Sequence, residues 1–169
     1  VGLVTAAGFA TLGNDVTAVD VNQAAVDQLS EGQSPIYEAG LSEAIHDGIA
    51  KGRLHFTTDL PKGVQGAEVI FVTVGTPANP DGTPNLTPLR AGVMAIAEAV
   101  TEPTIVAVKS TAPVGSLAEM QALVRTNGSD FIEIISNPEF LSEGTALTDF
   151  HNPSRIIVGA DSGRCHVVM

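Results

Sequence analysis

The chain has 169 residues, of which 44% are hydrophobic and 16% charged, so it suits one domain with a full core and lacks the composition of a disordered protein. Its formal net charge is −11, from 8 basic and 19 acidic residues without any cluster of lysine or arginine, which argues against nucleic acid as a partner. Its one cysteine, Cys165, rules out a disulfide framework within the chain, and its apolar runs are too short to span a bilayer. We therefore expect a cytoplasmic protein that binds neither nucleic acid nor membrane.

Helix and strand patterns alternate through the first third of the chain. Residues 1–12 are small and apolar and stop at Gly13, which is typical of a helix. Residues 16–20 alternate β-forming side chains and end in Asp20, and Asn22 is placed to cap a helix that follows. The remaining predicted elements here are a helix at 22–30, a loop at 34–38, a helix at 41–51, a strand at 54–57 and a short helix or turn at 61–66.

The rest of the chain keeps the same alternation. Residues 68–74 are almost continuously apolar, which predicts a strand buried on both faces. Residues 75–88 carry four prolines and two glycines and must form a loop. The pattern predicts an α/β fold, namely a doubly wound parallel sheet of the Rossmann type. The predicted elements after this loop are helices at 89–100 and 116–125, strands at 104–108, 131–135 and 155–159, and a polar turn at 109–115.

Polar residues follow several of the predicted strands. In a doubly wound sheet, ligands bind beyond the carboxyl ends of the strands, so we expect these residues to converge on one edge of one sheet. They are Asp20, the segment 73–76, Ser110 with Thr111, and Asn137 with Glu139 and Glu143.

A dinucleotide site is one interpretation of the first strand end. Asp20 lies 18 residues after Gly2, close to the interval between the last glycine of a dinucleotide fingerprint and the acid that binds the adenosine ribose. An acid at this place favours NAD over NADP. A turn-forming aspartate is the other interpretation, and Gly75 and Thr111 likewise suit either a ligand or an ordinary turn.

Two glutamates, Glu139 and Glu143, lie four residues apart just after the apolar run 131–135. They would face the same side if the segment were helical. A carboxylate beside a substrate can take a proton from water when it is partly desolvated. The alternative is a capping acid and a solvated acid on a short helix.

Four motifs occur in a fixed order along the chain, and together with Phe150, Pro153 and the segment 155–159 they resemble a known family. They are SPIYE at 34–38, VGTP at 74–77, KSTAPVG at 109–115 and NPEFLSEGTA at 137–146. The resemblance is to the N-terminal NAD-binding domain of UDP-glucose 6-dehydrogenases, within the UDP-glucose/GDP-mannose dehydrogenase family. It covers residues 1–161 and leaves 162–169, with Cys165, as an unmatched tail.

The resemblance implies an activity and a set of site residues. Enzymes of this kind oxidise UDP-glucose to UDP-glucuronate in two NAD-dependent steps, through a thioester on a cysteine. Glu143 would be the catalytic acid/base, and Thr111 would position the hydrolytic water. The implied NAD-binding residues are Gly2, Asp20, Val74, Thr76, Thr111 and Glu143, and the implied substrate-binding residues are Glu139, Phe140, Leu141, Ser142 and Glu143. We expect no metal, because the four histidines are scattered.

We also expect the chain to be a fragment, because it starts at Val1 in what looks like a helix. The resemblance then implies that the first strand and the nucleophilic cysteine are missing, and that Cys165 is not that nucleophile. We expect no turnover by this chain alone and a marginal fold, because the missing strand belongs in the middle of the sheet. The parent enzyme would be a homo-oligomer. Two alternatives remain, namely a sister GDP-mannose or UDP-N-acetyl-sugar dehydrogenase and a non-catalytic nucleotide-binding module.

Overall fold

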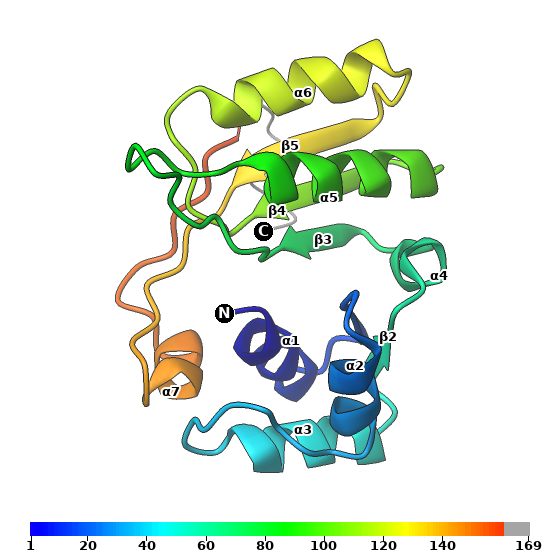
Figure 1. Cartoon of the computed structure of the whole chain (residues 1–169). Coiled ribbons are helices and arrows are strands. Elements are labelled where there is room, and N and C mark those ends of the chain that lie inside the picture. The colour runs from blue at the N-terminus through cyan, green and yellow to red at the C-terminus, as the bar shows by residue number, and fades with distance from the viewer. Residues whose placement is uncertain (161–169) are drawn as a thin grey trace. The chain divides into compact units, whose positions relative to one another are not determined.

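The computed structural model describes residues 1–160, in which helices and strands alternate as the sequence predicts (Figure 1). The predicted tail at 162–169 lies outside the described residues. The helices are α1 (Gly2–Thr11), α2 (Gln23–Ser30), α3 (Leu41–Ala50), α4 (Leu60–Val64), α5 (Thr87–Ala99), α6 (Ser116–Thr126) and α7 (Ala146–His151). The strands are β1 (Val16–Val19), β2 (Leu54–Thr57), β3 (Val69–Val72), β4 (Thr104–Val108) and β5 (Ile132–Ser136).

The strands pair in parallel, which confirms the predicted α/β class. They form two sheets, however, one of order β1-β2 and one of order β3-β4-β5. The register pairs Val16 with Leu54 in the first sheet, and Ile105 with Val69 and Glu133 in the second. No strand among the described residues hydrogen-bonds to both β1 and β3, so the polar residues that follow these strands are divided between two sheets.

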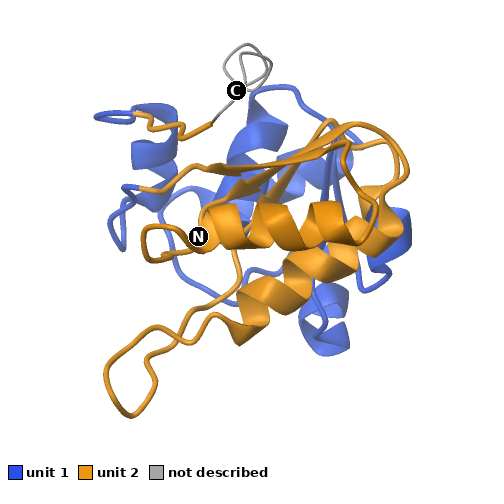
Figure 2. Ribbon diagram, turned by 90° about the horizontal axis from the view of Figure 1, so that it is seen from above, with its two compact units in different colours: residues 1–63, 140–155 blue, residues 64–139, 156–169 orange. Residues whose placement is uncertain are grey.

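The chain divides into two compact units, which Figure 2 shows in different colours. Unit 1 consists of Val1–Gly63 and Phe140–Arg155, and unit 2 of Val64–Glu139 and the chain from Ile156 onwards. Each unit carries one of the two sheets. Unit 1 is therefore assembled from two stretches that lie far apart in the sequence.

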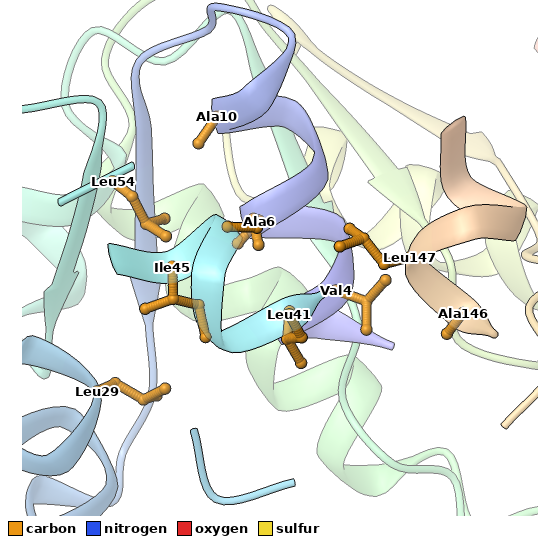
Figure 3. Packing of buried hydrophobic residues seen from close by; sticks show 11 residues of the cluster. Val4, Ala6, Ala10, Leu29, Leu41, Ile45, Leu54, Ala146 and Leu147 are labelled. Atoms are coloured by element: carbon orange, nitrogen blue, oxygen red, sulfur yellow. The ribbon is translucent and has the colours of Figure 1, made fainter. Parts of the chain in front are cut away.

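The core of unit 1 is built where α1, α3 and α7 meet (Figure 3). Val4, Leu41 and Ile45 are at most 1% exposed, and Val4 and Leu147 point toward one another. Small residues let α1 approach its neighbours closely. A methyl group added at Gly8 would lie 2.3 Å from the Phe150 ring, so α7 can pack against α1 at this point only because Gly8 has no side chain.

Two helices of unit 1 begin as their sequences predict. The Asn22 side chain accepts a hydrogen bond of 3.3 Å from the Ala25 N–H and caps α2. Gly40 precedes α3 with a φ of 78°, a backbone conformation that glycine adopts without strain.

The core of unit 2 is built around its central strand, β4, all five residues of which are buried. Ile105, Val106 and Ala107 have no exposed surface. The strand lies between β3 and β5, while α5 contacts β3, α6 contacts β5 and the two helices contact one another. A strand that is covered on both faces has a continuous apolar run in its sequence, and this run is why β4 was predicted correctly.

Three details of the predicted elements are wrong. Residues 155–159 form no strand but a single antiparallel bridge, in which Ser136 and Gly159 exchange two N–H to carbonyl bonds of 2.9 and 2.8 Å. The strand β3 ends at Val72, before the predicted end at residue 74. The segment 139–143 is not helical, since α7 begins only at Ala146, so Glu139 and Glu143 do not lie one helical turn apart.

None of the helices in residues 1–160 is long and apolar enough to cross a membrane.

Candidate functional site

Unit 1 presents Gly2 and Asp20 at the ends of two adjoining elements. Gly2 is the first residue of α1, whose N-cap makes no side-chain hydrogen bond and whose first turn carries no acid. The amides of this turn are therefore open to an anion. Asp20 follows β1 and is exposed, and its Oδ1 accepts a bond of 2.9 Å from the Asn22 N–H. Its second oxygen remains available to a ligand hydroxyl.

In unit 2, the predicted site residues Thr76 and Thr111 follow the ends of the neighbouring strands β3 and β4. The Ser110 hydroxyl, just after β4, donates a bond of 2.6 Å to the Val74 carbonyl beyond the end of β3. Ser110 therefore ties two strand ends together and does not cap α6, which follows Gly115 without a side-chain cap. The hydroxyls of Thr76 and Thr111 make no hydrogen bond to another described residue, so both are free for a ligand.

A buried polar pair follows the ends of β4 and β5. Asn137 is 5% exposed; its Nδ2 donates to the Ile157 carbonyl at 2.9 Å, and its Oδ1 accepts from Lys109 Nζ at 3.0 Å. Burial lowers the pKa of Lys109, and the charge of Glu139 partly opposes this shift. The bonds of Asn137 to Lys109 and Ile157 hold the backbone where the segment that leads to Glu139 begins.

The predicted substrate segment, 139–143, crosses from unit 2 to unit 1 after Glu139. In unit 1 the Phe140 ring lies 5.1 Å from the guanidinium of Arg155, close enough for a cation–π contact. Glu143 is exposed, and its side chain makes no hydrogen bond or ion pair with another described residue. The carboxylate is thus presented without a partner.

The backbone on both sides of Glu143 is held by carboxylates. The Ser142 N–H donates to Asp149 Oδ2 at 2.8 Å, and the Gly144 N–H donates to Glu38 Oε1 at 3.0 Å. The bond from Ser142, with further hydrogen bonds from the Ser142 and Thr145 side chains, lowers the pKa of Asp149. The loop therefore has a fixed backbone and a free central side chain.

The predicted site residues fall into two groups. Unit 1 holds Gly2, Asp20, Phe140, Leu141, Ser142 and Glu143, and unit 2 holds Val74, Thr76, Thr111 and Glu139. Sequence reasoning gave no role to Lys109, to the side-chain amide of Asn137, to Glu38 or to Asp149. Lys109 and Glu38 do occur within the quoted motifs, but their partners lie 28 and more than 100 residues away, so no local spacing signals the contacts.

Each unit presents groups that fit part of a dinucleotide. In unit 1 the helix N-terminus at Gly2 suits a pyrophosphate, and the exposed carboxylate of Asp20 suits a ribose diol. In unit 2 hydroxyls without a described partner follow β3 and β4. Together with parallel strands joined by helices, these features define a nucleotide-binding domain of the Rossmann class.

The family follows from similarity over the whole chain. The family described as UDP-glucose/GDP-mannose dehydrogenase, NAD binding domain, matches residues 1–169, and the chain belongs to it as that NAD-binding domain. A UDP-glucose 6-dehydrogenase of Rhizobium meliloti is 42% identical over 173 residues, covering 100% of this chain and 40% of the relative. One of Pseudomonas aeruginosa is 39% identical over 165 residues.

Solved structures agree with this assignment. A UDP-glucose dehydrogenase from Pyrobaculum islandicum is 37% identical with a TM-score of 0.93, over 99% of this chain and 40% of that one. A GDP-mannose dehydrogenase from Pseudomonas aeruginosa is 31% identical with a TM-score of 0.95, over the same shares. The chain thus spans about 40% of the length of these relatives.

Proposed function

We propose that this chain is the NAD-binding part of a UDP-glucose 6-dehydrogenase, which oxidises UDP-glucose to UDP-glucuronate in two NAD-dependent steps. The single observation that supports it most is the Glu143 loop, in which a carboxylate without a hydrogen-bond partner among residues 1–160 lies between two anchored amides. The relatives named UDP-glucose 6-dehydrogenase, at 42% and 39% identity, support the choice of sugar nucleotide. The enzyme would work in the cytoplasm as a homo-oligomer.

The cofactor is NAD, which supplies the hydride acceptor when bound. Gly2 opens the first turn of α1, whose free amides would bind the pyrophosphate. Asp20 would accept hydrogen bonds from the adenosine ribose, and the carboxylate favours NAD over the 2′-phosphate of NADP. Val74 and Thr76, beyond β3, would line the rest of the cofactor site.

Glu143 would act as the acid/base. An exposed carboxylate without an ion-pair partner can take a proton from water once a bound substrate removes its solvent. The resemblance to the family implies that Thr111 positions that water, and its hydroxyl makes no bond to another described residue. The segment from Glu139 to Glu143 would contact the sugar nucleotide.

The test measures NADH formation from UDP-glucose by the polypeptide encoded by the complete reading frame that contains this chain. The wild-type should reduce two NAD per UDP-glucose, and Glu143→Gln should lower kcat by at least about a hundredfold, since it removes a general acid/base. Glu43→Gln, on the exposed face of α3, is the matched control and should leave kcat unchanged.

Two results would contradict the proposal, and a third would contradict a separate expectation. GDP-mannose or a UDP-N-acetyl sugar as the better substrate would favour a sister enzyme. NAD binding without turnover of any sugar nucleotide would favour a non-catalytic module. Formation of UDP-glucuronate by the 169-residue chain alone would contradict our expectation that the nucleophilic cysteine lies outside it.

A further inference from the structure

We propose that Glu38 is the positioning residue for Glu143. This inference rests on the proposed function, since it assigns Glu38 a role in the reaction that Glu143 would catalyse. Glu38 does not touch the reacting atoms. It acts through the backbone of the loop that carries the acid/base.

Glu38 uses both of its oxygens on this loop. Oε1 accepts the Gly144 N–H at 3.0 Å, and Oε2 accepts the Ala146 N–H at 3.2 Å. Both donors lie within three residues of Glu143, and both belong to unit 1 like Glu38 itself. A bidentate carboxylate fixes the direction as well as the position of the two amides.

Asp149 completes the arrangement from the other side of Glu143. Its Oδ2 accepts the Ser142 N–H at 2.8 Å and the Thr145 hydroxyl at 3.2 Å. The two neighbours of Glu143, Ser142 and Gly144, are therefore each bonded to a different carboxylate. Among the polar side chains of residues 142–145, that of Glu143 is the one without a described hydrogen-bond partner.

The anchor itself rests on packed structure. Ala146 and Leu147, the first residues of α7, are only 6% and 9% exposed and belong to the core of unit 1 (Figure 3). Gly40, two residues after Glu38, lies beside Leu147, since an added methyl group would be in ordinary van der Waals contact with its Cδ2, at 3.5 Å. Glu38 thus joins the loop to a rigid part of the unit, which is what a positioning residue requires.

In this geometry both bonds need the two oxygens of a carboxylate. Glutamine has one accepting oxygen, so one of the two amides would face its NH₂ group and lose its partner. The charge of the carboxylate also strengthens both bonds. Glu38→Gln therefore removes one anchor with almost no change in volume.

The test compares Glu38→Gln in two backgrounds of the complete polypeptide. In the wild-type background kcat should fall about ten- to hundredfold, because a small displacement of a catalytic group lowers the rate strongly. The KM for NAD should change less than about twofold. In the Glu143→Gln background the same substitution should change kcat less than about twofold, since two residues that act as a unit are not additive. Glu43→Gln is the matched control and should match wild-type.

A second measurement reports the contact directly. Amide hydrogen exchange in residues 142–147 should be faster in Glu38→Gln than in Glu43→Gln, because the bonds at Gly144 and Ala146 are weakened.

The outcomes separate the two proposals. A wild-type polypeptide that forms no NADH from UDP-glucose refutes the proposed function, and the exchange rates then decide whether Glu38 holds the loop. An active wild-type in which Glu38→Gln matches Glu43→Gln, or lowers kcat equally in both backgrounds, overturns the positioning role.

Discussion

The two units hold their site residues in different ways. Unit 2 carries Thr111 and Glu139 just beyond β4 and β5, next to a strand whose residues are all buried and to the buried amide of Asn137. Unit 1 carries Glu143 in a loop without regular structure, held by the carboxylates of Glu38 and Asp149. In unit 2 the position of a side chain follows from strand packing, whereas in unit 1 it depends on a few charge-assisted bonds near solvent. The comparison predicts that unit 2 is strongly destabilised by the loss of a polar group at its Lys109–Asn137 pair, and that the stability of unit 1 depends on pH through the carboxylates of its loop.

The largest expected effect is at the buried pair of unit 2. Asn137→Leu removes a nearly buried amide, so Lys109 loses its bond to Oδ1 and the Ile157 carbonyl loses its donor, which should cost about 2–4 kcal/mol of unfolding free energy. Asn127→Leu is the control, because this asparagine is exposed and its side chain bonds only to the Leu123 carbonyl at the end of α6, and it should cost about 1 kcal/mol or less. Urea denaturation measures both. Equal losses of unfolding free energy in the two variants would mean that the Lys109–Asn137 pair adds nothing to the stability of unit 2.

A smaller effect is expected at the helix contact of unit 1. Gly8→Ala places a methyl group 2.3 Å from the Phe150 ring, so α7 must move away from α1, at about 1–3 kcal/mol. Gly92→Ala in α5 of unit 2 is the matched change, because its added methyl would meet only Val74, at 4.0 Å. That substitution should stabilise its helix by up to about 1 kcal/mol. Thermal denaturation of the two variants should therefore shift in opposite directions, and a shift in the same direction would contradict the close packing at Gly8.

The smallest effect concerns the exposed carboxylates. The pKa of Asp149 is lowered by its bonds from the Ser142 backbone and side chain and from Thr145, so its contribution to stability is present above its usual pKa and is lost as pH falls through the lowered value. Asp149→Asn should therefore be less stable than wild-type near neutral pH, and the difference should close below about pH 4. Urea midpoints at several pH values measure this difference.

Asp81 in unit 2 is the matched carboxylate for this experiment. Its pKa is also lowered by hydrogen bonds, from the side chain and backbone of Thr83 two residues away, but the bonded turn holds no buried residue. Asp81→Asn should change the midpoint less than Asp149→Asn at every pH. A larger effect at Asp81 would show that the loop of unit 1 gains little from its carboxylate.

The elements of the fold could be predicted because their signals are local. The apolar run of β4 and the Asn22 cap each depend on residues a few positions apart, and both are confirmed. The segment 155–159 forms no strand, because only Gly159 bonds to β5 and only Val158 of its apolar residues packs against the core of unit 2, while Ile156 and Ile157 are 69% and 45% exposed. A short apolar run by itself therefore indicates neither burial nor a complete ladder of hydrogen bonds.

The site could be predicted only in part, for a related reason. Polar residues after predicted strands pointed to Asp20 and Thr111, and the resemblance added the roles of the loop residues. The helical arrangement considered for Glu139 and Glu143 does not form, because the amides of the loop bond elsewhere, that of Ser142 to Asp149 and that of Gly144 to Glu38. A contact across more than 100 residues leaves no trace in local spacing. These roles remain predictions until the variants are measured.

The order of the two units along the chain has a consequence for synthesis on the ribosome. Unit 1 needs Ala146 and Leu147 to complete its core, but these residues emerge only after the whole of 64–139, which belongs to unit 2. Until then Val4 and Leu41 lack part of their cover, and closing so long a loop costs entropy. The nascent chain therefore carries an incomplete apolar surface while residues 64–139 are made, and Glu143 can reach its place only after them.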